Sequence, residues 1–302
     1  MALEVFRPTK RITREHVMIY SRPGFGKTRL STSLTPRWGE ILYYAADMGS
    51  AETGSMLRKY GDRVHVVNPV SEATDAKTKK KVKVASNPVH DFTEFCMMDW
   101  TGFVDPVTKE MPYKNVKTLV VDTYTTIANK CLQWSADHSS VTAEQHFKIG
   151  DPEHGGRVVP NRGDYLGLYS ITRGFMDLLD QHQSHMNIIF NMHEELNSPE
   201  GAAAIGGPSH PGQQMLEELP GMFDTVIRIT RRPVPAKDGK PATFKLYANT
   251  APTGVYLGKV RENGEGGNPI PSIELNIDPI NFWEVYDHEI AHIETLVAQE
   301  TV

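Results

Sequence analysis

Residues 17–34 read Val-Met-Ile-Tyr-Ser-Arg-Pro-Gly-Phe-Gly-Lys-Thr-Arg-Leu-Ser-Thr-Ser-Leu, and this stretch decides the fold. The apolar run Val17–Tyr20 predicts a buried strand, and residues 29–34 predict a helix before Pro36. Between them, residues 21–28 fit the pattern of Gly, four free residues and Gly-Lys-Ser/Thr, except that Ser21 takes the place of the first Gly. A strand, a tight loop and a helix start are typical of a polyphosphate-binding loop.

This loop predicts an ATP site with Mg²⁺. Lys27 would neutralise charge on the β- and γ-phosphates, and the Thr28 hydroxyl would bind Mg²⁺. Ser can replace the first Gly if its φ stays negative. The alternative is an ordinary Pro-Gly turn before a helix. The predicted ATP-binding residues are Ser21, Arg22, Pro23, Gly24, Phe25, Gly26, Lys27, Thr28 and Arg29.

Length and composition narrow the class of protein. The chain has 302 residues, 39% hydrophobic and 23% charged, which is typical of a soluble globular protein. Its two cysteines, Cys96 and Cys131, are too few for a disulfide framework or a four-thiolate zinc site, so we expect a reducing, cytoplasmic compartment. We find no secretory signal and no apolar run of membrane-spanning length.

The charge distribution limits how nucleic acid could bind. The net charge of −5 excludes a protein that grips nucleic acid over its whole surface, so any DNA contact must be local. One basic cluster consists of Lys77, Lys79, Lys80, Lys81 and Lys83. Its alternative interpretation is a solvated hairpin or loop.

Apolar, β-branched runs alternate with helical patterns along the chain, which predicts an α/β fold with a mostly parallel sheet and helices between the strands. The expected strands are Val17–Tyr20, Ile41–Ala45, Val64–Val67, Thr118–Asp122, Asn187–Asn191 and Thr225–Thr230, followed by antiparallel strands at Phe244–Tyr247 and Gly254–Gly258. The expected helices are Glu52–Tyr60, Phe92–Trp100, Thr125–Trp134, Tyr165–Gln181 and, near the C-terminus, 287–299. We expect a single domain over 1–302 with inserted loops at 70–90, 138–163 and 195–212.

Polar residues follow three of the predicted strands. Asp122 ends an apolar strand, as the Mg²⁺ side of a phosphate-loop site requires, although it could instead cap the next helix. His193 follows the strand ending at Asn191 and could sense the γ-phosphate, or it could be a satisfied edge histidine. Asp47 follows the strand Ile41–Ala45 and could orient the attacking water, with Glu52 as the second candidate. Either carboxylate could be only a helix cap.

On these residues the chain resembles the RecA-like P-loop ATPases, in particular the phage recombination and single-strand annealing branch, a phage AAA-type nucleotide-binding family. The residues that carry the resemblance are 24–28, Asp47, Asp122-Thr123, 164–179 leading into 187–194, and 219–224. It implies a RecA-like core, an ATPase role and a catalytic acid at Asp47, where that family usually has Glu. It also implies that the loop after His193 faces DNA. That loop lacks Lys and Arg, so we expect His210 and Asn197 to be its polar contacts.

Lys259 and Arg261 form a Lys-x-Arg pair after an expected strand. On an extended chain the two side chains point the same way, and together they could approach one γ-phosphate. RecA-like relatives carry a similar pair that reaches into a neighbouring subunit's ATP site, which implies a homo-oligomer, either a ring or a filament. The alternative is a solvated pair of cations.

Residues 288–292 read His-Glu-Ile-Ala-His, a pattern that zinc proteases share. We interpret it as the polar face of a terminal helix, because Glu294 is the only nearby third ligand and nothing builds a substrate cleft around it.

The sequence therefore predicts an ATP- and Mg²⁺-dependent ATPase that binds single-stranded DNA in recombination or annealing, in the host cytoplasm if it is phage-encoded. A single-strand-binding protein is a further possible partner, and no membrane is expected. The alternatives are a nucleotide-gated DNA-binding assembly protein with little turnover, a DNA-packaging motor and a small-molecule kinase.

Overall fold

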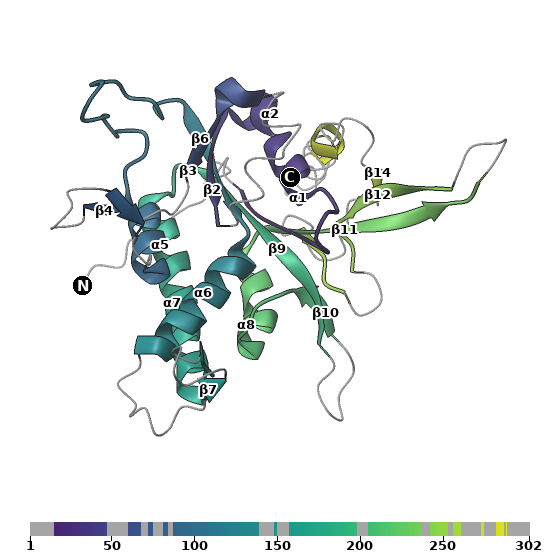
Figure 1. Ribbon diagram of the computed structural model, residues 1–302. Helices are drawn as coiled ribbons and strands as arrows, with labels where there is room; N and C mark the ends of the chain where they lie inside the picture. The colour runs from purple at the N-terminus through teal and green to yellow at the C-terminus, as the bar shows by residue number, and fades with distance from the viewer. Residues whose placement is uncertain are drawn as a thin grey trace, which may run out of the picture.

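A computed structural model describes residues 15–46, 60–67, 72–74, 81–83, 87–138, 148–149, 157–197, 205–236, 242–252, 256–260, 273–274, 282–286 and 288. Its centre is one twisted sheet with helices on both faces (Figure 1). The strands of this sheet are β1 (His16–Ser21), β2 (Glu40–Ala45), β3 (Val64–Val67), β6 (Val116–Asp122), β9 (Asn187–Asn197), β10 (Ile205–Pro208), β11 (Thr225–Val234), β12 (Thr243–Asn249), β13 (Lys259–Val260) and β14 (Ile273–Glu274).

The strands follow the order β14-β12-β11-β1-β9-β6-β2-β3, with β10 paired to β9 and β13 to β11. The six strands from β11 to β3 are parallel, and β12, β13 and β14 add to them in antiparallel pairs. The predicted α/β class and all six predicted parallel strands are therefore confirmed. Because the parallel strands point the same way, their carboxyl ends share one edge, where ligands bind in open α/β sheets.

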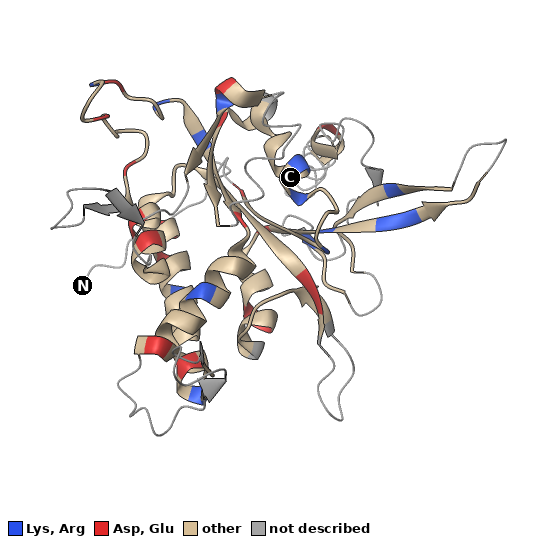
Figure 2. Ribbon diagram, in the orientation of Figure 1, with Lys and Arg blue, Asp and Glu red and all other residues tan. Residues whose placement is uncertain are grey.

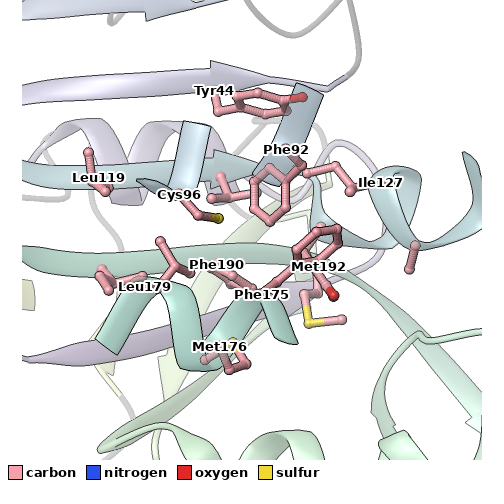
Figure 3. Packing of buried hydrophobic residues seen from close by; sticks show 14 of the residues in the cluster. Tyr44, Phe92, Cys96, Leu119, Ile127, Phe175, Met176, Leu179, Phe190 and Met192 are labelled. Atoms are coloured by element: carbon pink, nitrogen blue, oxygen red, sulfur yellow. The ribbon is translucent and has the colours of Figure 1, made fainter. Parts of the chain in front are cut away.

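Alternating side chains give the sheet two buried faces. One face packs against α5 (Pro88–Met97), α6 (Tyr124–His138) and α7 (Arg162–His182), with aromatic contacts such as Tyr44 against Phe92 (Figure 3). Residues on neighbouring strands that point to this face include Met18 and Phe190. Both faces are covered, as the apolar character of the parallel strands requires.

The opposite face packs against α1 (Lys27–Thr32), α2 (Thr35–Trp38) and a helical segment at 282–286. Trp283 is fully buried there, and its indole N–H donates to the carbonyl of Leu30 (3.1 Å) and the hydroxyl of Ser33 (3.2 Å). Pro36 lies in the first turn of α2, where its missing N–H costs nothing. The helix that follows the loop is thus held by a segment from the far end of the chain.

Parts of all three predicted insertions form short antiparallel hairpins. The 70–90 segment contains β4 (Glu72–Thr74) paired with β5 (Lys81–Lys83), and the 138–163 segment contains β7 (Lys148–Ile149) paired with β8 (Arg157–Val158). In the 195–212 segment, β9 continues to Asn197 and pairs with β10. The prediction of loops was wrong for these paired residues. Hydrogen bonds between the paired strands keep these polar residues extended.

Other boundaries differ from the prediction. Helix α5 begins at Pro88 because the Asn87 side chain accepts hydrogen bonds from the N–H groups of Val89 and His90, and it ends at Met97. Within the described part of the expected strand 254–258, Tyr256 makes an isolated parallel bridge to Gly206. The strand in this part of the chain is β13 instead, which pairs with β11.

The remaining described elements are the helix α8 (Gln213–Glu218) and the short 3₁₀ turns η1 (Gly61–Arg63) and η4 (Leu219–Met222). Of the expected helices at 52–60 and 287–299, only Tyr60 and His288 lie within the described residues. Among the described helices, none is both long and apolar enough to cross a lipid bilayer.

Candidate nucleotide-binding site

The predicted phosphate loop joins β1 to α1 at the carboxyl edge of the sheet. Gly24 and Gly26 have φ values of 77° and 87°, a left-handed conformation that side chains other than Gly rarely adopt. Gly26 is also the N-cap of α1, so the backbone N–H groups of the first helical turn point toward the loop. Ser21 ends β1 and is not among the described residues with positive φ, so this position does not require Gly.

Lys27 is held inside the loop. Its side chain is 6% exposed, and Nζ lies 3.2 Å from the carbonyl oxygen of Ser21 and 3.5 Å from the Ser21 hydroxyl and the Arg22 carbonyl. These acceptors fix the ammonium group before any phosphate arrives. A fixed, nearly buried cation binds a polyphosphate more strongly than a cation on a flexible surface side chain.

Thr28 and Asp122 come together at this edge. The Thr28 hydroxyl donates a 2.6 Å hydrogen bond to Oδ2 of Asp122, and the Tyr43 hydroxyl donates to the same oxygen. The Asp122 carboxylate is 1% exposed. The alternative role as a helix cap belongs instead to Thr123, whose carbonyl and hydroxyl both accept from the N–H of Thr126.

These residues fit a Mg²⁺ ion that is shared with phosphates. The described residues contain no group of three or more His, Cys, Asp and Glu able to hold a metal ion. A phosphate-bound Mg²⁺ does not need one, since it takes a hydroxyl and a carboxylate from the protein and fills its other positions with phosphate oxygens and water. Thr28 and Asp122 are such a pair of residues.

Asn191 belongs to this site and was not predicted. It lies on β9 in register with Asp122 on β6 and Ile19 on β1, and its side-chain amide donates to the Ser31 hydroxyl at 3.0 Å. Its Oδ1 is buried, and no donor reaches it from the part of the chain that the structure describes. A buried acceptor left without a donor costs about 1–3 kcal/mol, so a water or ligand hydroxyl would be stabilised here.

His193 lies beside the phosphate loop, but not at a strand tip as predicted. Strand β9 continues past it, and it pairs in register with Ser21. Its N–H donates to the Thr125 hydroxyl at 3.0 Å, and its carbonyl accepts from the N–H of Ser209 at 2.6 Å. The backbone of His193 therefore ties β9 to both α6 and the segment that follows β10.

A partly buried ion pair adjoins the loop and was also missed. The Glu194 side chain is 6% exposed and accepts from Arg228 at 2.8 and 3.3 Å. Arg22 of the phosphate loop approaches the same carboxylate at 3.6 Å. The guanidinium of Arg228 also stacks on the Tyr256 ring, 3.3 Å from its centroid. Glu194 thus connects the loop, β9 and β11.

Lys259 lies away from this chain's own phosphate loop. It pairs with Val226 at the amino end of β11, whereas the loop is at the carboxyl end of the neighbouring parallel strand β1. Its ammonium group donates to the carbonyls of Pro220 (3.4 Å), Gly221 (3.1 Å) and Phe223 (2.8 Å). Within its own chain, Lys259 therefore braces η4.

Several predicted residues lie outside the described residues, namely Asp47, Glu52, Arg261, Lys77, Lys79, Lys80 and the second His of the 288–292 motif. Lys81 and Lys83 belong to strand β5. The prediction that His210 contacts DNA was wrong, because its side chain is only 2% exposed. Its Nδ1 accepts from the N–H of Gly212 at 3.0 Å, and its Nε2 lies 3.2 Å from the Thr172 hydroxyl.

Comparison with known proteins agrees with this geometry. The family model described as an AAA domain matches residues 13–261, which include the phosphate loop, Asp122 and Asn191. No curated protein matches the chain. Since the match covers most of the chain, the protein belongs to the AAA domain family of P-loop NTPases and is a nucleotide-binding ATPase.

Proposed function

We propose that this protein is an ATP- and Mg²⁺-dependent ATPase that binds single-stranded DNA in recombination or annealing, as phage ATPases of the RecA-like type do. The observation that carries the proposal is the contact of Thr28 with Asp122 beside Asn191, on a sheet whose strand β9 continues directly into the β9–β10 hairpin. This arrangement supports both nucleotide chemistry and its coupling to a hairpin outside the site.

Each residue has a role in the proposed reaction. The loop N–H groups and Lys27 hold the phosphates, while Thr28 and Asp122 would hold Mg²⁺, which neutralises charge on the β- and γ-phosphates. Asn191 orients a water through its Oδ1, which accepts a hydrogen bond from it. Asp47, or Glu52 as the second candidate, orients the attacking water, and both lie outside the described residues.

Coupling to DNA would run along β9. Asn191 and His193 lie in the site, and the same strand reaches Asn197 before pairing back through β10. A change at the γ-phosphate that shifts β9 would therefore move the hairpin as well. The loop after His193 is the proposed DNA-facing element.

We also propose a homo-oligomer in which Arg261 completes a neighbour's ATP site. Of the Lys259–Arg261 pair, Arg261 is the better candidate for this role, because Lys259 already donates to backbone carbonyls of its own chain. A single-strand-binding protein is a further proposed partner. The two cysteines, Cys96 and Cys131, are buried free thiols, in keeping with a cytoplasmic location.

The test is steady-state ATP hydrolysis with and without oligo(dT), with Lys27→Ala protein as the blank. DNA-stimulated turnover is the expected result. DNA binding that depends on ATP but has no turnover would favour a nucleotide-gated assembly protein. Turnover without any DNA binding would overturn the DNA part of the proposal.

The proposed oligomer has its own test. Arg261→Ala protein and Lys27→Ala protein, each inactive alone, should partly recover hydrolysis when mixed, because some interfaces then pair an intact loop with an intact Arg261. Co-assembly without recovery would contradict a site completed across the interface.

A further inference from the structure

Strands β11 and β12 continue as a two-stranded ribbon away from the body of the molecule (Figure 1). At its base, Ile229 and Ala248 are fully buried in the sheet. Further out, the pairing continues to Val234 opposite Thr243, and most side chains become exposed. We call residues 231–234 and 243–246 the outer ribbon. Leu246 packs against the core at the base of the outer ribbon, but core packing does not explain the exposed side chains of the ribbon.

The outer ribbon is strongly basic. It carries Arg231, Arg232 and Lys245, all exposed, and the described residues 225–236 and 242–252 include no Asp or Glu (Figure 2). The residues that link the two strands add two Lys and one Asp. The whole chain has a net charge of −5, so this concentration of cations is local. A basic projection on an acidic protein attracts polyanions.

Each face of the ribbon also carries an aromatic ring under a guanidinium group. The Arg231 guanidinium lies 3.6 Å from the centroid of Phe244, and that of Arg232 lies 4.2 Å from the centroid of Tyr247. Arg231 is opposite Leu246 in the ladder and Arg232 is opposite Lys245, so the two stacks lie on opposite faces. Phe244 is 55% exposed, so part of its ring is open to solvent and can contact a ligand.

Cations beside an exposed aromatic ring match the chemistry of single-stranded nucleic acid. The guanidinium groups bind phosphates, and the rings stack on bases that are not hidden in a duplex. We propose that the outer ribbon binds single-stranded DNA, with Arg231 and Arg232 on phosphates and Phe244 stacked on a base. This inference rests on the proposed function and adds a DNA contact distinct from the β9–β10 hairpin.

The ribbon also adjoins the nucleotide site. Leu246 lies on the same face as Arg231 and Phe244, and its Cδ1 is 3.5 Å from where a Cβ on Gly26 would be. A DNA strand bound along this face would therefore pass next to the phosphate loop.

The first experiment measures binding of fluorescently labelled oligo(dT) to the full chain over a range of salt concentrations. The test variant is Arg231→Ala/Arg232→Ala, and the matched control is Arg63→Ala/Lys114→Ala, which removes two exposed cations elsewhere. Because each lost phosphate contact lowers the salt slope by about 0.7, we expect the test variant to lose about 1.4 from the slope and at least about tenfold in affinity at low salt. The control should match the wild type.

Thermal unfolding should be unchanged in both variants, because all four residues are exposed. Test and control variants with equal affinities and salt slopes would overturn the ribbon assignment while leaving the proposed function intact. A wild-type protein that binds no oligonucleotide would overturn the DNA part of the proposed function together with this inference. The two failures are thus distinguishable.

The second experiment tests stacking on Phe244. Wild-type protein should prefer oligo(dT) over an abasic strand of equal length by at least about fivefold, because stacking contributes about 1–3 kcal/mol per base. Phe244→Leu should lose this preference and keep the salt slope. An unchanged preference would exclude Phe244 as the stacking residue, and equal affinity for duplex DNA would overturn the single-strand assignment.

Discussion

The Thr28 hydroxyl donates a 2.6 Å hydrogen bond to the Asp122 carboxylate although the two residues are 94 positions apart in the chain. Thr28 lies in the first turn of α1 after the phosphate loop, and Asp122 ends β6, which is separated from β1 by β9. The pair holds a hydroxyl and a carboxylate ready for a cation.

Lys27→Ala should weaken ATP binding by at least about tenfold, because a hydrogen bond to a charged group contributes about 1.5–3 kcal/mol. The residue is 6% exposed and already aimed into the loop. Binding of a fluorescent ATP analogue measures the change, with Lys114→Ala as the surface control. Normal hydrolysis by Lys27→Ala protein would show that the site assignment is wrong.

Asp122→Asn should remove the Mg²⁺-dependent part of ATP binding, about tenfold or more, and leave binding in EDTA nearly unchanged. The amide keeps the size of the side chain and an oxygen that can accept from Thr28 but loses the charge that a cation needs. The measurement is titration with the ATP analogue at increasing Mg²⁺. Thr28→Ser keeps a hydroxyl, so it should retain the Mg²⁺ dependence that Thr28→Ala loses.

Asn191→Ala should lower kcat at least about tenfold with little effect on ATP affinity, since it removes the buried Oδ1 acceptor that would hold a water near the reacting phosphate. His193→Ala is the matched comparison, because the contacts of His193 with Thr125 and Ser209 are made by its backbone. Steady-state kinetics of both variants decides between the two residues. A larger loss of kcat in His193→Ala would return the sensing role to His193.

Stability should fall in mild acid because of His210. Burial lowers the pKa of His210 from 6.5 to about 4, and the nearby Gly212 carbonyl opposes this shift only in part. The neutral imidazole is favoured in the folded state, so its stabilisation is present above pH 6.5 and is lost as the pH falls toward 4. We expect the free energy of unfolding to drop by about 2 kcal/mol between pH 7 and pH 5 from this group.

Urea denaturation of the wild type and of His210→Gln at both pH values isolates this contribution. The difference between the two proteins should shrink by about 2 kcal/mol on acidification, because only the wild type takes up the proton. A difference that does not change with pH would show that the imidazole titrates in its ordinary range.

The sequence was sufficient to predict the parallel strands, because each is a short apolar run between polar segments. It did not predict the full length of β9, because residues such as His193 and Glu194 read as a polar loop and are held as strand only by pairing with β1 and β10. Similarly, α5 starts at Pro88 through an Asn cap that lies before the apolar pattern begins. The end of β9 and the start of α5 are set by strand pairing and by a side-chain cap, which hydrophobic periodicity does not report.

For the site, motif spacing was sufficient to identify Lys27, Thr28 and Asp122 as candidate residues. It could not identify Asn191 or Tyr43, because a polar group within an apolar strand looks like any core residue until the strand order is known. β9 lies directly between β1 and β6, which puts Asn191 in register with Asp122. The Glu194–Arg228 pair was missed for the same reason, since its partners lie on strands that do not pair with each other.

The burial of Trp283 against Leu30 and Ser33 sets an order of events during synthesis. Leu30 precedes Trp283 by 253 residues, so at roughly 5–20 residues per second its helix waits roughly 13–50 s on the ribosome for that cover. Strand β1 likewise waits for both of its neighbours, β9 and β11. Helix α1 thus gains its cover only after Trp283 has been made, so the packing behind the phosphate loop is completed only once translation has passed that residue.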